Sequence, residues 1–290
     1  MTQAMFDATA PEPSAPATAV AVAESPAPAA VGSPAAWSLG QRLGFRFFFS
    51  YFLLYLFPFP LDYIPYPVKP LELYQRGLNG LVLWVGRVLF GQTITVFPNG
   101  SGDTTYNYVQ LFCYLTIACV ATAVWSVLDR KRLAYPRLQQ WFRLYLRFAL
   151  ATAMLSYGAI KVIKSQFPNP SLGRLIQPFG DASPMGLLWT FMGASKAYTN
   201  FSGACEMLGG FLLTARRTTL LGALVCFGVI TNIVLLNFCY DVPVKLYSSH
   251  LLLISAVLIA PDARRLINLL ILNRPAGPSP IGPLFNRRFL

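Results

Sequence analysis

The sequence predicts an all-α integral membrane protein with about six transmembrane helices. Hydrophobic residues make up 55% of the 290-residue chain and charged residues only 12%, about half the charged share of an average soluble domain. Six apolar stretches near the length that crosses a bilayer recur along the chain, at residues 40–57, 108–128, 144–164, 198–213, 219–238 and 246–259.

The basic residues, which give a formal net charge of +12, are distributed as membrane topology requires. Of the 23 Lys and Arg residues, 15 lie in one alternating set of segments between the apolar stretches and 8 in the other. Because short cytoplasmic loops are enriched in Lys and Arg, this bias predicts a multi-pass protein of a bacterial inner membrane with both termini cytoplasmic. No basic soluble module studded with aromatic residues is present, so nucleic acid is not an expected partner.

The first elements are a tail and a membrane helix. Residues 1–36 are rich in Ala and Pro and cannot bury enough apolar surface to order themselves, which predicts a disordered tail. The next region, 37–143, combines transmembrane and interfacial helices with an outer loop. Its first helix is the stretch at 40–57, which the prolines of residues 58–70 bring to an end.

The segment at 73–90 differs from the other apolar stretches. Arg76 and Arg87 fall roughly on one helical stripe that also carries Asn79. Two arginines on a stripe favour a helix that lies in the membrane interface over one that crosses it. We therefore expect an interfacial helix here, followed by an outer loop that leads to the stretch at 108–128.

The C-terminal membrane region, residues 144–272, holds the last four apolar stretches. The first two of these are separated by residues 165–196, whose Pro and Gly residues predict a long ordered loop with a short helix at 184–193. Residues 273–290 predict a cytoplasmic tail.

Glu206 is an acidic residue inside an apolar stretch. At 1.5 Å per residue it lies about 12 Å below the outer end of its helix, where an unpaired carboxylate costs several kcal/mol. Gly203, Gly209 and Gly210 share its helix face and let a neighbouring helix approach closely. Lys161 lies near the outer end of the preceding stretch, and the height mismatch of about 6 Å is within reach of its side chain. The pattern predicts a Glu206–Lys161 ion pair inside the protein, with proton exchange as its candidate chemistry.

Further polar side chains at a similar predicted height are candidate ligand-binding residues: Tyr157, Asn232, Asn237 and His250, with Asp241 and Lys245 in the outer turn. Two interpretations stay open. In one, these groups form a structural network that fixes the packing of the helices. In the other, they line a pocket, open to the outer leaflet, that binds a polar-headed lipophile or relays protons. A cavity beside Glu206 would distinguish the two interpretations.

Metal and covalent cofactor sites are not expected. His250 is the single histidine, which argues against a multi-histidine metal or haem site. The five cysteines form no CxxC pair and lie in or beside apolar stretches, which is typical of small residues in a membrane core.

Three segments carry a resemblance to a known family: "YGAIKVI" (157–163), "FSGACEMLGGFLLTARRTTLLGAL" (201–224) and "NIVLLNFCYDVPVKLYSSHLLLISAVLIAPD" (232–262). On these segments, residues 148–270 resemble the DoxX-like membrane protein family. The resemblance implies a four-helix membrane bundle over residues 144–272. It also implies a link to redox chemistry, because relatives are associated with thiosulfate:quinone oxidoreductase subunits and with thiol redox-stress complexes.

These observations predict a redox-associated inner-membrane subunit with a pocket that a quinone or another lipophile can enter. Glu206 would exchange protons with the head group or hydrogen-bond it, Lys161 would hold its charge, and Asn232 and His250 would orient the ligand. The chain has no flavin or haem motif, which favours a protein without catalytic activity of its own. Electrons would then come from a soluble redox partner or from other subunits of a membrane complex.

Other functions remain open at this point. If the chain is an enzyme, the resemblance favours a quinone-linked oxidoreductase subunit. The non-enzymatic alternative is a structural or assembly subunit of the membrane, in which the same polar network holds the helices together. A small-molecule permease is a third alternative, although the chain shows no inverted repeat and no pair of broken helices.

Overall fold

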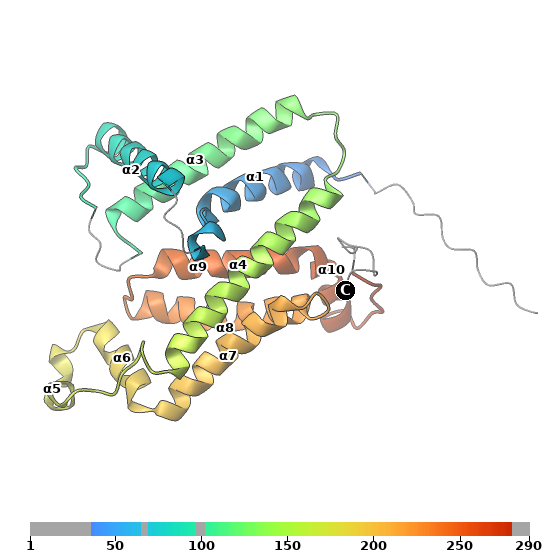
Figure 1. Cartoon of the computed structure of the whole chain (residues 1–290). Coiled ribbons are helices and arrows are strands. Elements are labelled where there is room, and N and C mark those ends of the chain that lie inside the picture. The colour runs from blue at the N-terminus through green and yellow to red at the C-terminus, as the bar shows by residue number, and fades with distance from the viewer. Residues whose placement is uncertain (1–35, 65–68, 97–101, 280–290) are drawn as a thin grey trace, which may run out of the picture. The chain divides into compact units, whose positions relative to one another are not determined.

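The computed structural model describes residues 36–64, 69–96 and 102–279, which belong to one unit of the chain, Ala36–Leu290. Within these ranges all regular secondary structure is helical, which confirms the all-α prediction (Figure 1). The predicted disordered tail lies outside the described residues except for its last residue, as does the end of the predicted cytoplasmic tail.

The N-terminal region contains three long helices. α1 (Leu39–Leu56) and α3 (Thr105–Leu128) each begin at a capping box, in which the hydroxyl of Ser38 or Thr104 accepts a bond from the backbone three residues on. The side chain at that third position bonds back to the cap, so two backbone donors of each helix end are satisfied. α3 packs against both α1 and α2 (Lys69–Phe90), and α2 covers the segment predicted to lie in the interface.

α4 (Pro136–Val162) begins eight residues before the predicted stretch at 144–164. Pro136 stands in its first turn, where the missing N–H of proline is not needed. Arg137 and Arg143, which precede the predicted apolar stretch, therefore lie on this helix. Charged residues end an apolar stretch without ending the helix, because Arg has a high helix propensity.

The C-terminal region contains four long helices that contact one another in chain order: α4, α7 (Lys196–Thr214), α8 (Thr219–Cys239) and α9 (Lys245–Ile259). α4 also contacts α9, so the first and last helices of the set are neighbours (Figure 1).

Shorter helices occupy the connections. α5 (Leu172–Ile176) and α6 (Pro184–Ala194) lie between α4 and α7, and α6 matches the predicted short helix at 184–193. α6 packs against α7. A 3₁₀ turn, η3 (Ala260–Asp262), follows α9 and leads into α10 (Ala263–Leu270). Two more such turns are η1 (Leu61–Tyr63) and η2 (Phe179–Asp181).

Glycines allow α4 and α7 to approach closely. A Cβ on Gly203 would lie 2.6 Å from the carbonyl oxygen of Gly158, and a Cβ on Gly158 would lie 2.6 Å from the carbonyl oxygen of Gly203. Both distances are too short for real carbon–oxygen contacts. Gly209 and Gly210 are also buried, and Gly209 faces Cys226 of α8. The predicted glycine face is therefore the packed face of α7.

Four helical stretches in the described part of the chain are long and apolar enough to cross a membrane: Leu39–Tyr63, Thr105–Leu128, Thr219–Cys239 and Lys245–Leu270. They cover four of the six predicted spans. The other two predicted spans lie in α4 and α7, which carry arginines, Lys161 and Glu206 and are correspondingly less apolar. Four apolar helices indicate a membrane protein.

Candidate functional site

A cavity of about 290 Å³ lies among α4, α6, α7, α8 and the first turns of α9. Most of its lining is apolar, with Met154, Trp189 and Leu251 contributed by three different helices. The polar side chains that reach it include Tyr157, Lys161, Gln166, Ser202, Glu206 and Asn232. An apolar cavity with a few convergent polar groups is typical of a small-molecule site.

Glu206 and Lys161 lie together in the wall of this cavity. Glu206 is fully buried in the middle of α7, and Lys161 is 6% exposed in the last turn of α4. The Lys161 Nζ donates a hydrogen bond to Glu206 Oε1, and the two residues form an ion pair. The partners predicted from helix height are thus brought together, because the Gly158–Gly203 contact holds α4 and α7 close at this level.

The second carboxyl oxygen of Glu206 has no partner in the described part of the chain. Glu206 Oε2 is buried and accepts no hydrogen bond from any described residue. An unsatisfied buried polar atom of this kind costs on the order of 1–3 kcal/mol. A buried ion pair repays its desolvation only when further hydrogen bonds satisfy the remaining lone pairs. The carboxyl group is therefore set up to accept a hydrogen bond from a molecule in the cavity, or to carry a proton itself.

Three of the other predicted ligand-binding residues also line the cavity. The Tyr157 ring lies 5.9 Å from the ring of Tyr247 and forms part of one wall. Asn232 on α8 is exposed, so its amide is free to turn toward the cavity. Asn237 is buried, and its Nδ2 donates to the Ser248 Oγ at 2.9 Å, which ties α8 to α9.

His250 does not line the cavity, contrary to its predicted role as a ligand-orienting residue. Its Nδ1 donates to the Leu246 carbonyl at 2.6 Å, so its Nε2 accepts a hydrogen bond from the Tyr51 hydroxyl of α1. Its ring stacks on Tyr55, with the centroids 3.9 Å apart. The sequence predicts the position of His250 along the axis of α9, but it does not predict the direction in which the side chain points. The cavity side of α9 is the one that carries Leu251.

Asp241 and Lys245 do not line the cavity either, although the residues between them do. Lys245 Nζ bonds Asp241 Oδ1 at 2.6 Å, an ion pair whose carboxylate is largely exposed. The turn itself is anchored by Asp103, whose carboxylate accepts bonds from the backbone N–H groups of Lys245 and Leu246 at 2.6 and 2.9 Å. The ion pair therefore stabilises the rim rather than contacting a ligand.

The connection between α4 and α7 supplies part of the cavity wall that the sequence did not predict. Gln166 lines the cavity, and its Oε1 is buried with no partner among the described residues. α6 adds Trp189 and is held to α7 by the Thr199 hydroxyl, which donates to the Met192 carbonyl at 2.5 Å. Lys164 donates to the Gly193 carbonyl at 2.8 Å. A Pro-rich loop has no hydrophobic periodicity, so the sequence does not indicate which part of the protein the loop packs against.

The cysteines and the other possible metal ligands do not form a second site in the described part of the chain. All five cysteines are free thiols, with Cys113 and Cys226 buried. In the described part of the chain, no three His, Cys, Asp or Glu side chains lie close enough together to hold a metal ion.

The chain is similar to the uncharacterized protein YwoB of Bacillus subtilis (strain 168). The two are 35% identical over 130 residues, which cover 44% of this chain and 79% of that relative. No protein-family model matches the chain. No solved structure matches it either.

Proposed function

Because the chain belongs to the family of the uncharacterized protein YwoB of Bacillus subtilis, whose name gives no activity, we propose its function from the site itself. The protein binds a polar-headed lipophile of the quinone type in the cavity beside Glu206. It does so as a DoxX-like, redox-associated subunit of the bacterial inner membrane, and it receives electrons from a soluble partner or from other subunits of a complex.

The observation that carries the proposal is the position of Glu206 Oε2. This oxygen is buried without a partner among the described residues, and its side chain lines a cavity of about 290 Å³. A cavity of about 150 Å³ is enough to bind benzene. The space beside Glu206 is therefore large enough for a substituted ring, and the carboxyl oxygen supplies an acceptor for a hydroxyl on that ring.

Each polar residue of the cavity has a distinct role in this proposal. Lys161 fixes Glu206 Oε1 and balances its charge, which leaves Oε2 for the ligand. Asn232 and Tyr157 offer an amide and a phenol that orient the head group. A proton can be exchanged between a ring oxygen of the bound molecule and Glu206 Oε2 across the hydrogen bond between them, and when electrons from the partner reduce a bound quinone the proton passes from Glu206 to the ring oxygen. His250 and Asn237 act indirectly, through the packing of α9 against α1 and α8.

The proposed topology has six spans, with α4 and α7 crossing the membrane beside the four more apolar helices. Support comes from the burial of Lys161 and Glu206, because charged groups that face the protein interior do not meet lipid. The bias of the basic residues supports a cytoplasmic position for both termini. α2 then lies in the interface, and the cavity opens toward the outer leaflet.

A structural or assembly role is the second candidate, and one observation favours it. Lys161 and Glu206 join α4 to α7 at the level where Gly158 and Gly203 bring the two backbones together. An ion pair at such a contact fixes the packing of the helices whether or not a ligand binds.

Fluorescence titration tests the binding proposal, because Trp189 lines the cavity. A variant that keeps Trp189 and has its other four tryptophans replaced by Phe is titrated in detergent with a short-chain quinol, whose ring hydroxyls can donate to Glu206. We expect saturable quenching, and at least tenfold weaker binding after Glu206→Gln. The matched control is Glu72→Gln, at a largely exposed glutamate of α2. Quenching that does not saturate, or that is equal in all variants, would favour the structural role.

A further inference from the structure

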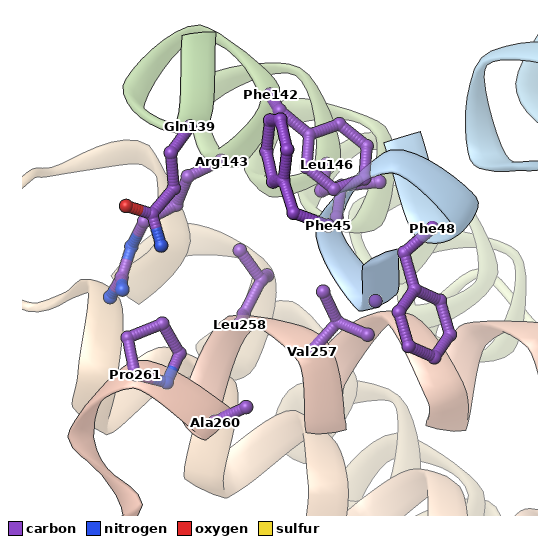
Figure 2. Close-up of a pocket in the computed structure, with 11 residues that line it drawn as sticks. Phe45, Phe48, Gln139, Phe142, Arg143, Leu146, Val257, Leu258, Ala260 and Pro261 are labelled. Atoms are coloured by element: carbon purple, nitrogen blue, oxygen red, sulfur yellow. The ribbon is translucent and has the colours of Figure 1, made fainter. Parts of the chain in front are cut away.

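A second cavity, of about 160 Å³, lies between α1, α4 and the end of α9 (Figure 2). Its lining is mainly apolar and includes Phe45, Phe48, Phe142, Leu146, Val257 and Leu258. Two polar side chains of α4, Gln139 and Arg143, reach it from the side of Pro261, away from Phe48 (Figure 2). The cavity is thus amphipathic along its length, with a basic end and an aromatic end.

Arg143 is incompletely paired. Its side chain is 16% exposed, and its Nη2 lies 3.6 Å from Asp262 Oδ2, beyond a good hydrogen bond. Its Nη1 is buried and has no hydrogen-bond partner among the described residues. Asp262 is itself fully buried and also bonds Arg265 Nη1, so this carboxylate is shared between two guanidinium groups.

The surroundings of Arg143 carry an excess of positive charge. Arg147 follows one helical turn later, close enough to Arg143 and Arg216 to be repelled by both. Among the described residues, Arg147 donates hydrogen bonds to neutral acceptors, the Thr219 hydroxyl at 3.3 Å and the Thr214 carbonyl at 3.5 Å. Asp262 is thus the carboxylate that faces Arg143 and Arg265, and one negative charge does not balance the cluster. The basic end of the cavity can therefore accept an anion.

We propose that this cavity binds an anionic phospholipid, with a phosphate oxygen on Arg143 Nη1 and the start of an acyl chain along Phe45, Phe48 and Leu258. A guanidinium presents its N–H groups as a planar fork that matches phosphate oxygens. Basic pockets between membrane helices are known sites for such head groups. The apolar end distinguishes a lipid from a free phosphate, because an inorganic ion gains nothing from aromatic side chains. This cavity is separate from the cavity of Glu206, because different parts of α4 line the two. Phe142, Arg143 and Leu146 line this cavity. Met154, Tyr157 and Lys161 line the cavity of Glu206.

Native mass spectrometry of the full chain, delipidated in detergent, tests this inference. Short-chain phosphatidylglycerol is compared with phosphatidylcholine of the same chain length and with inorganic phosphate. We expect at least tenfold tighter binding of phosphatidylglycerol, and loss of that preference after Arg143→Gln. Arg137→Gln is the matched control, because Arg137 is an exposed arginine in the first turn of the same helix.

Two further variants distinguish the loss of a lipid contact from a folding defect in Arg143→Gln. Arg143→Lys keeps the positive charge but not the fork, and we expect a several-fold weaker preference. Val257→Phe fills the apolar end without changing any charge, and it should weaken phosphatidylglycerol binding as well. Equal binding of the two lipids, competition by inorganic phosphate at the same concentration as lipid, or unchanged binding in Arg143→Lys and Val257→Phe would each overturn the proposal.

Discussion

At the scale of single residues, the proposed function depends on the buried carboxyl group of Glu206. One of its oxygens is bound by Lys161, and the other is buried with no partner among the described residues, in a side chain that lines the cavity. A carboxylate used only for packing is expected to have both oxygens satisfied. The unsatisfied oxygen is therefore the strongest support for the proposal that the cavity binds a ligand.

The coupling of Lys161 to Glu206 predicts a marked non-additivity. Lys161→Met should lower the free energy of unfolding by about 3–5 kcal/mol, because it leaves a buried charge without its partner. The double variant Lys161→Met/Glu206→Met should recover most of that loss. Unfolding titrations in mixed detergent measure both. The Arg76–Glu72 pair, which is largely exposed, serves as control and should show no such coupling. Additive losses at Lys161 and Glu206 would contradict a direct buried pair.

His250 predicts a separation of stability from ligand binding. His250→Phe removes the acceptor of the buried Tyr51 hydroxyl and should cost about 1–3 kcal/mol of unfolding free energy. Retention of the lipophile should not change, because His250 lies outside the lining of the cavity. A thermal melt and a lipid extraction on the same sample check the two effects. A variant of normal stability that loses its lipophile would show that His250 contacts the ligand.

At the scale of helices, the contact of α4 with α7 positions the site. Gly203→Ala should lower the free energy of unfolding by about 1–3 kcal/mol, because the new Cβ meets the Gly158 carbonyl at 2.6 Å. Gly228→Ala on α8 is the matched control, since a Cβ there meets nothing within 4 Å. The control should be neutral or stabilising by up to about 1 kcal/mol. Comparable losses in the two variants would mean that the glycine contact does not hold α4 and α7 together.

The helices of this fold could be predicted from the sequence more completely than the residues of the site. Apolar stretches located the long helices, and residue heights along them brought Lys161 to Glu206. The same reasoning missed the first eight residues of α4, because hydropathy marks the membrane-facing part of a helix and not its ends. It also placed His250 in the cavity. The rise per residue gives the position of His250 along the helix axis, but the direction in which its side chain points depends on how α9 packs against α1. Gln166 and Trp189 went unpredicted, since they lie outside the long helices.

At the scale of the whole molecule, the proposed six-span topology predicts opposite sides of the membrane for two exposed loop positions. Lys131 lies between α3 and α4, and Asp181 between α4 and α7. In a chain whose five cysteines are replaced by Ala, Lys131→Cys should react with a membrane-impermeant thiol reagent only after the cells are permeabilised. Asp181→Cys should react in intact spheroplasts. Reaction of both positions from the same side would mean that α4 does not cross the membrane.

The two proposals assign the two cavities to different kinds of lipid. One lies beside Glu206 and has both a carboxyl acceptor and an ion pair. The other lies beside Arg143 and has an excess of basic groups. A neutral hydroxyl-bearing head group suits the first cavity, and an anionic head group suits the second. Variants of Glu206 should therefore leave phosphatidylglycerol binding unchanged, and variants of Arg143 should leave quinone binding unchanged.

The most direct measurement is mass spectrometry of the lipids and proteins that remain with the chain after purification in mild detergent. Wild type and Glu72→Gln should each retain a quinone-type lipophile, and Glu206→Gln, checked for normal folding by gel filtration, should retain at least tenfold less. An absence of any such lipophile from all three proteins, or equal retention in Glu206→Gln, would show that the cavity beside Glu206 is not its binding site.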